Sequence, residues 1–177
     1  IKEVAEEGTQ NILDAIPDKC KIIFPSTHVV FEGTSDIKKN IQENEKTQPV
    51  LSYSKSKAFN EEQIKKSGKK YVILRLGSVY GYSTDTARID IMPNLFSKIA
   101  SQDGLIKLFA GGRQIKSLVP LIDVARCFKF MEEKEDIKSE TFNLTKETLT
   151  VKEVAKFLRI KERTVRYYLN DSKEIPY

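Results

Sequence analysis

KIIFPST, at residues 21–27, is a short run of apolar residues that ends in two hydroxyl side chains. Ile22, Ile23 and Phe24 follow one another without the polar alternation of a half-exposed strand. Such a run is typical of a strand that is buried on both faces of a parallel sheet. A second run of this kind, KYVILRL, occupies residues 70–76. The two runs therefore predict two buried strands of a parallel sheet.

The segments around these runs have helical or polar patterns. Apolar residues recur at helical spacing over residues 2–16, up to Pro17, and the pattern from Tyr53 to Lys66 is also helical. The polar stretch 34–49 between them predicts a long loop. The order helix, strand, loop, helix, strand indicates an α/β fold in which crossover helices join parallel strands.

The chain changes character after Gly81, where a polar loop predicts the start of a second region near residue 84. The expected helices lie at residues 91–101, 124–133 and 151–158, and the expected strands at 106–109, 117–122 and 141–144. Thr150 stands where it can cap the last of these helices. We therefore expect a sheet domain followed by a smaller region.

The composition excludes several classes of protein. Of 177 residues, 40% are hydrophobic and 31% are charged, which is too apolar for a disordered chain. Two distant cysteines, Cys20 and Cys127, exclude a disulfide scaffold and indicate reduced thiols in a cytoplasmic protein, with no metal site. No apolar run reaches the roughly 18 residues that a membrane-spanning helix needs. The net charge of +5 fits a lysine-rich surface, so neither a membrane nor a nucleic acid is the expected partner.

The sequence YSKSK, at residues 53–57, carries the most specific chemical signal. Tyr53 and Lys57 are four residues apart, so they lie on one face of the predicted helix. A free tyrosine is a poor base at neutral pH, but a fixed ammonium nearby lowers the pKa of a phenol. Such a pair can move a proton to or from an alcohol oxygen.

Hydroxyl and glycine residues follow the two predicted strands. The first strand ends at Thr27, and the second runs into Gly77 and Ser78. Parallel α/β sheets place their ligand-binding groups at the carboxyl ends of strands. Thr27 can therefore hydrogen-bond the same oxygen that Tyr53 protonates.

Four motifs, in this order, resemble the extended short-chain dehydrogenase/reductase family: PSTHVVFEG (25–33), YSKSK (53–57), ILRLGSVYG (73–81) and IDVARCF (122–128). More narrowly, they resemble its NAD-dependent epimerase/dehydratase branch, which acts on nucleotide sugars. The resemblance implies that residues 1–83 are the second half of a Rossmann-type, doubly wound parallel sheet. It implies that residues 84–177 form a smaller substrate-binding region. It also implies NAD or NADP as cofactor, a nucleotide-sugar substrate and a homodimer.

The resemblance assigns roles residue by residue. Tyr53 matches the catalytic acid/base, Lys57 matches the lysine that tunes it and binds the nicotinamide ribose, and Thr27 matches the hydroxyl that orients the substrate. Gly77 and Ser78 fall where the chain passes the nicotinamide, and Ser78 also faces the substrate. The remaining substrate contacts are Lys116, where many members carry an arginine, and Asp90, where several carry an asparagine.

Departures from the family pattern narrow the range of reactions that the resemblance implies. His28 and Val29 stand where sugar 4,6-dehydratases carry an Asp-Glu pair, which disfavours elimination chemistry. STHVVFEG resembles the 4-ketoreductases, whereas the segment at Asp123 resembles the epimerases, so both activities stay open. No glycine-rich dinucleotide turn occurs in the sequence. From this we expect that the first third of a usual member is missing and that the chain alone is inactive.

Two alternatives come from other functional classes. One is a non-catalytic regulatory subunit that keeps the NAD(P)-binding fold. The other is a DNA-binding tail, because residues 149–171 also resemble a helix-turn-helix motif. In that motif Ala155, Ile160 and Val165 would pack two helices, and Arg163 and Arg166 would face DNA. We expect an NAD(P)-dependent nucleotide-sugar epimerase or a related oxidoreductase.

Overall fold

The two apolar runs are neighbouring strands in the structure, a computed structural model that describes residues 3–34, 40–84, 88–158 and 165–168. Strands β1 (Lys21–Thr27) and β2 (Lys70–Leu76) pair in parallel, from Lys21 opposite Lys70 to Thr27 opposite Leu76. Strand β6 (Glu140–Leu144) joins the other edge of β2, also in parallel. The predicted parallel sheet of an α/β fold is confirmed, in the order β1-β2-β6.

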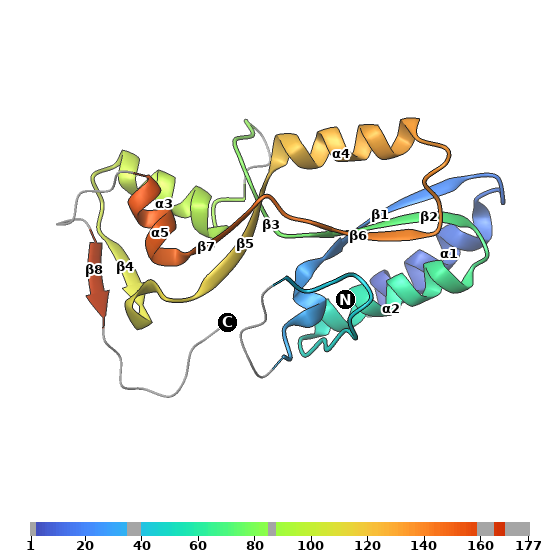
Figure 1. Ribbon diagram of the computed structural model, residues 1–177, viewed down its shortest axis with the longest axis horizontal. Helices are drawn as coiled ribbons and strands as arrows, with labels where there is room; N and C mark the ends of the chain where they lie inside the picture. The colour runs from blue at the N-terminus through green and yellow to red at the C-terminus, as the bar shows by residue number, and fades with distance from the viewer. Residues whose placement is uncertain (1–2, 35–39, 85–87, 159–164, 169–177) are drawn as a thin grey trace. The chain divides into compact units, whose positions relative to one another are not determined.

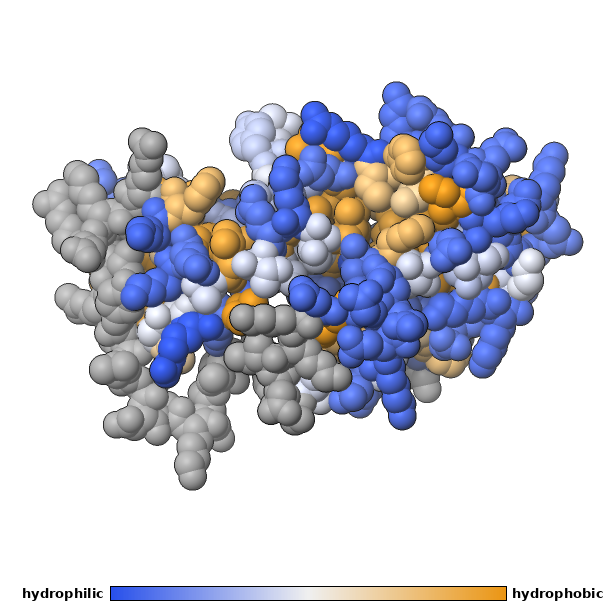
Figure 2. Space-filling model, in the orientation of Figure 1, coloured by the Kyte–Doolittle hydropathy of each residue, from blue (hydrophilic) through white to orange (hydrophobic). Residues whose placement is uncertain are grey.

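Helices cover both faces of this sheet (Figure 1). Helix α2 (Ser52–Lys66) lies on one face together with α1 (Gly8–Ala15), which follows the short π-helix η1 (Glu3–Glu7). Helix α4 (Leu121–Glu133) lies on the opposite face, where Met131 packs in one cluster with Val72 and Leu74. Apolar atoms also reach the surface in the region of α4, among hydrophilic side chains (Figure 2).

Burial differs between the two predicted strands. Val72, Ile73 and Leu74 of β2 are completely buried, as the sequence predicted. Ile22, Ile23 and Phe24 of β1 are only half-buried, so the prediction of burial on both faces is wrong for this strand. The reason is topological: in the described part of the chain β1 is an edge strand, whereas β2 has a strand on each side.

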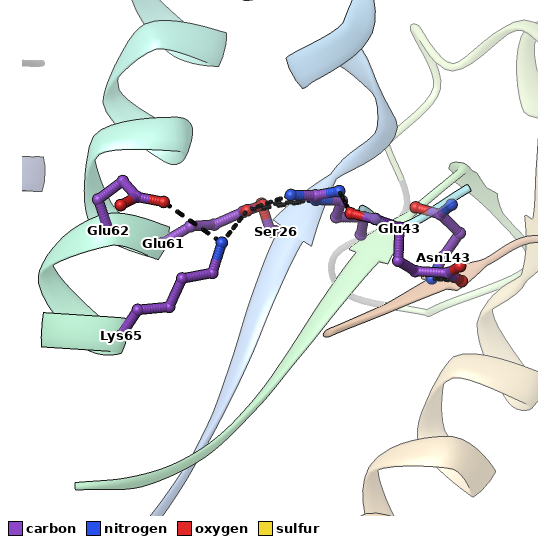
Figure 3. Close-up of polar contacts among 7 residues, drawn as sticks. Ser26, Glu43, Glu61, Glu62, Lys65 and Asn143 are labelled. Carbon is purple, nitrogen blue, oxygen red and sulfur yellow. Dashed lines mark hydrogen bonds and ion pairs between the residues drawn. The ribbon is translucent and has the colours of Figure 1, made fainter. Parts of the chain in front are cut away.

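A buried ion pair joins α2 to the sheet (Figure 3). Arg75 of β2 and Glu61 of α2 are 3% and 2% exposed, and Arg75 Nη2 lies 2.7 Å from Glu61 Oε2. Arg75 Nε adds a bond of 3.0 Å to Glu61 Oε1, and Ser26 of β1 donates to the same oxygen at 2.5 Å. Burying two charges costs roughly several kcal/mol per ion. The forked geometry of the pair and its further hydrogen bonds must offset this cost.

The same arginine holds the loop that precedes α2. Arg75 Nη1 donates to the carbonyl oxygen of Glu43 at 2.9 Å, and the Glu43 carboxylate accepts from the backbone N–H of Asn143 at 2.9 Å. The side-chain amide of Asn143 in turn donates to the carbonyl oxygen of Ile41 at 2.9 Å. The predicted long loop is therefore fixed to β2 and β6 at residues 41–43.

The second unit is built from short strands and two helices. Strands β3 (Ser78–Tyr80), β5 (Ile115–Pro120) and β7 (Glu147–Thr150) form one sheet, with β3 parallel and β7 antiparallel to β5. Strand β4 (Ile106–Phe109) pairs in parallel with β8 (Val165–Tyr168). Helices α3 (Met92–Ser101) and α5 (Val151–Phe157) share a core with these strands that includes Phe96, Leu108, Leu118 and Val154. Thr150 caps α5 in a capping box with Glu153, as predicted.

The division of the chain differs from the expected boundary after residue 83. The first unit comprises Ile1–Gly77 and Ile122–Leu144, and the second comprises Ser78–Leu121 and Thr145–Tyr177. Residues 122–144 return to the first unit because α4 packs on its sheet and β6 pairs with β2. Strands β3 and β7 were not predicted, since Ser78–Tyr80 is only three residues long and Glu147–Thr150 contains a single apolar residue, Leu149.

The helix-turn-helix alternative conflicts with the structure where the two can be compared. It requires a second helix through Val165 and Arg166, but these residues belong to strand β8. Two other residues of the proposed motif, Ile160 and Arg163, lie outside the described residues. Within the described part of the chain, no helix is both long and apolar enough to cross a membrane.

We predict that Arg75→Met lowers the free energy of unfolding by about 3–5 kcal/mol, because it leaves the Glu61 carboxylate buried without its partner. Urea denaturation followed by circular dichroism measures this loss. The double variant Arg75→Met/Glu61→Leu should recover most of it, since an apolar pair of similar volume replaces the ion pair. Lys129→Ala, which breaks an exposed 3.8 Å pair with Glu133, is the control and should cost less than about 1 kcal/mol. A double variant no more stable than Arg75→Met would contradict the prediction.

Candidate functional site

Lys57 projects from α2 toward the end of β1. Its ammonium donates a hydrogen bond of 2.8 Å to the carbonyl oxygen of Pro25 and lies 4.6 Å from the centre of the Phe24 ring. Burial lowers the pKa of Lys57, because a less solvated site disfavours the charged form. The position of the ammonium is therefore set by the strand that ends at Thr27.

Tyr53 lies one helical turn before Lys57 and lines the same pocket. This pocket of about 290 Å³ has a mainly apolar wall and opens among η1, α1, β1 and α2. From η1 and α1 it is lined by small and apolar residues such as Val4 and Gly8, and from β1 by Phe24. Tyr53 is 50% exposed. The structure thus brings Tyr53 and Lys57 to one cavity.

Thr27 is the last residue of β1 and is 8% exposed. Its hydroxyl oxygen accepts a long hydrogen bond of 3.4 Å from the backbone N–H of Val29, at the start of the 3-10 helix η2 (His28–Phe31). His28 beside it lies 2.9 Å, through Nδ1, from the carbonyl oxygen of Leu76 at the end of β2. Pro25, whose carbonyl oxygen holds Lys57, lies two positions before Thr27, so both belong to the carboxyl end of β1.

Gly77 is the remaining predicted site residue of the first unit. It follows β2, and its N–H donates to the carbonyl oxygen of Leu144 at 3.0 Å. Thr27 pairs in register with Leu76, the residue before Gly77. The carboxyl edge of the sheet therefore carries Thr27 and Gly77 on adjacent strands, as the α/β pattern predicts.

The other predicted residues lie in the second unit. Ser78 begins β3, and Lys116 is half-buried in β5 opposite Leu149. Asp90 lies ahead of α3, where its exposed carboxylate pairs with Arg88 at 2.5 Å. The hydrogen bond from Arg88 lowers the pKa of Asp90. The substrate contacts of these three residues stay predictions.

The buried pair beside this site was not predicted from the sequence, although a signal was present. Arg75 is a charged residue within the apolar run KYVILRL, and a charge at such a position requires a buried partner. Glu61 lies four residues after Lys57 on α2 and is that partner. In the described part of the chain, no group of three or more His, Cys, Asp or Glu residues could hold a metal ion.

A protein-family model covers most of the first unit. The model described as RmlD substrate binding domain matches residues 2–109, which include Thr27, Tyr53, Lys57 and Gly77. No curated protein sequence matches the chain.

Solved structures resemble the chain at low sequence identity. A UDP-glucose 4-epimerase from Thermotoga maritima, solved with UDP-glucose, gives a TM-score of 0.76 at 23% identity over 89% of this chain. A dTDP-glucose 4,6-dehydratase from Bacillus anthracis, solved with NAD, gives 0.78 at 16% identity over 94%. A UDP-glucuronic acid 4-epimerase from Bacillus cereus, solved with UDP-glucuronic acid and NAD, gives 0.78 at 22% identity over 92%.

The chain spans about half the length of these solved proteins, 53%, 56% and 54% respectively. At these identities the likeness concerns the fold. It confirms the predicted α/β fold with a Rossmann-type parallel sheet.

We predict that the Lys57 ammonium titrates below the ordinary lysine value of 10.5, because burial disfavours its charge. Reductive methylation with ¹³C-formaldehyde, followed by NMR across the alkaline range, gives the titration midpoint. The resonance is assigned by its absence from Lys57→Arg. A midpoint equal to those of exposed lysines in the same spectrum would contradict the half-buried position described.

Proposed function

Because the chain belongs to the RmlD substrate binding domain family, we propose that it carries the acid–base site of an NAD(P)-dependent enzyme that acts on a nucleotide sugar. One observation supports this most strongly. Tyr53 and Lys57 line one pocket, and the Lys57 ammonium bonds to the carbonyl oxygen of Pro25, two residues before Thr27. A phenol, an ammonium and a hydroxyl at the carboxyl edge of a parallel sheet are the groups that alcohol–ketone chemistry needs.

In this proposal Tyr53 transfers the proton of a sugar hydroxyl. When the alcohol is oxidised, the Tyr53 phenolate takes the hydroxyl proton, and in the reverse direction the phenol returns it to the carbonyl oxygen. The Lys57 ammonium stabilises the phenolate by its charge. Thr27 donates a hydrogen bond to the same sugar oxygen and so holds it toward Tyr53. A nicotinamide cofactor, when bound, would take up or supply the hydride.

The pocket suits the nicotinamide end of such a cofactor. Its apolar wall can take the face of a planar ring, and Lys57 has three N–H donors, of which the Pro25 carbonyl uses one. Lys57 and Tyr53 would bind ribose hydroxyls, and Gly77 would let the chain pass close to the ring. The sequence has no glycine-rich turn for the pyrophosphate. NAD and NADP differ only at the adenosine ribose, and none of these residues is proposed to contact that ribose, so the proposal covers both cofactors.

Two activities fit this site. An epimerase would oxidise and re-reduce the same sugar carbon, whereas a 4-ketoreductase would only reduce it. The reductase is favoured by STHVVFEG, which lies within the matched residues 2–109. The proposal also includes substrate contacts from Ser78, Asp90 and Lys116, a homodimer and a cytoplasmic location. A non-catalytic, cofactor-binding subunit is the competing proposal.

We predict that Tyr53→Phe lowers kcat by about 10²- to 10⁴-fold, the usual contribution of a general acid/base. Cofactor affinity should stay within a few-fold, because the ring remains. The assay uses the protein expressed from its complete natural gene. UDP- or dTDP-linked hexoses with NAD or NADP test epimerisation, the corresponding 4-keto sugars with NADH or NADPH test reduction, and calorimetry measures cofactor binding. Tyr82→Phe makes the same change at an 85% exposed tyrosine and should leave kcat unchanged.

The outcomes separate the candidates. Equal turnover of Tyr53→Phe and the wild type would reject Tyr53 as the acid/base. Cofactor binding without turnover of any tested sugar by the wild type would favour the non-catalytic subunit. Turnover without net consumption of cofactor indicates an epimerase, and stoichiometric consumption of NADH or NADPH indicates a reductase.

A further inference from the structure

Helix α2 carries Tyr53 and Lys57, yet its own N-terminus lacks a capping side chain. The residue at the N-cap position is Leu51, which offers no side-chain hydrogen bond. The first backbone N–H groups of any helix have no partner within the helix and need one elsewhere. The N-cap residue itself therefore does not hold the start of α2.

Glu32, at a distant position in the sequence, holds the two residues that lead into α2. Its Oε1 accepts hydrogen bonds from the backbone N–H of Val50 at 2.9 Å and of Leu51 at 2.7 Å. It also accepts a short hydrogen bond from the hydroxyl of Ser54. Ser54 is a completely buried residue. A carboxylate at a helix N-terminus is further stabilised by the helix dipole. One oxygen atom thus holds the two residues before α2 and one residue of its first turn.

Glu32 is itself fixed to the end of β1. It directly follows η2, which begins after Thr27, and its N–H donates to the carbonyl oxygen of Val29 at 3.1 Å. A backbone pair then clamps the segment: Gly33 N–H donates to Gln48 O at 2.9 Å, and Gln48 N–H donates to Val30 O at 2.8 Å. A Cβ on Gly33 would lie 2.6 Å from Gln48 O, so this close approach requires glycine.

The ionisation of Glu32 is consistent with this arrangement. Burial acts to raise the pKa of the carboxyl group, but the hydrogen bonds from Leu51, Ser54 and Val50, with the nearby His28, outweigh it and lower the pKa. The group is therefore a carboxylate at neutral pH, the form that accepts all three hydrogen bonds.

We infer that Glu32 is a positioning residue for the acid–base site: its carboxylate fixes the start of α2 against the segment that leaves β1, and so holds Tyr53 in place relative to Thr27. The inference rests on the proposed function for its catalytic consequence. Its structural part does not, because the hydrogen bonds to Val50, Leu51 and Ser54 exist whatever the protein binds.

Amide hydrogen exchange on the present chain tests the structural part. In Glu32→Ala the amides of Val50, Leu51 and Lys55 should exchange roughly 2- to 30-fold faster, the range that a lost helix cap gives. Lys55 is included because its N–H donates the first helical bond, to Leu51 O at 2.9 Å. Glu32→Gln keeps an acceptor oxygen and should be intermediate. Glu153→Ala removes the capping glutamate of α5 and should leave these three amides unchanged.

Kinetics test the catalytic part in the protein expressed from its complete natural gene. Glu32→Ala should lower kcat about tenfold or more with KM within a few-fold, because misplacing an acid/base group slows chemistry rather than binding. Glu32→Gln should restore part of kcat. If Glu32→Ala does not fold, Glu32→Gln alone should show both effects at smaller size.

Unchanged amide exchange in Glu32→Ala would overturn the inference. Faster exchange with unchanged kcat, in a protein that Tyr53→Phe inactivates, would also overturn it, since Glu32 would then only cap the helix. If Tyr53→Phe has no effect on turnover, the proposed function fails, and amide exchange still decides whether Glu32 fixes the start of α2.

Discussion

The buried ion pair between Arg75 and Glu61 is the constraint on which the first unit depends. Its two charges can be buried only if their hydrogen bonds are satisfied, and Ser26 and the Glu43 carbonyl complete the set. The pair therefore fixes β1, β2, α2 and the preceding loop relative to one another. Glu61 lies on the helix that carries Tyr53 and Lys57, so the helix that bears the proposed acid–base residues is held by charge as well as by packing.

Two further sets of contacts hold α2 near the proposed site. Lys57 is held by the Pro25 carbonyl and the Phe24 ring, and Glu32 holds the start of α2. Each contact joins α2 to β1 or to the segment that leaves it. The proposed chemistry thus uses one strand end and one helix, which these contacts join, and the pocket beside them has a mainly apolar wall.

Much of the fold could be predicted from the sequence, because long apolar runs and helical spacing are local patterns. Residues 70–76 were predicted as a strand with the bounds that β2 has. Of the four motifs that suggested a family, all except IDVARCF at 122–128 lie within the residues 2–109 that match the RmlD substrate binding domain. The contacts of Arg75 and Glu32 could not be predicted in this way, because they join residues 14 or more positions apart in the sequence. The return of residues 122–144 to the first unit was missed for the same reason.

The backbone clamp between Gly33 and Gln48 has a consequence for how this protein can diversify. Gly33 is fixed by the clamp, and Ile41 is tied to Asn143. Both ends of the intervening segment are therefore anchored independently of its length. Because doubling the length of a loop adds only about 0.6 kcal/mol of closure entropy, insertions there should cost little stability.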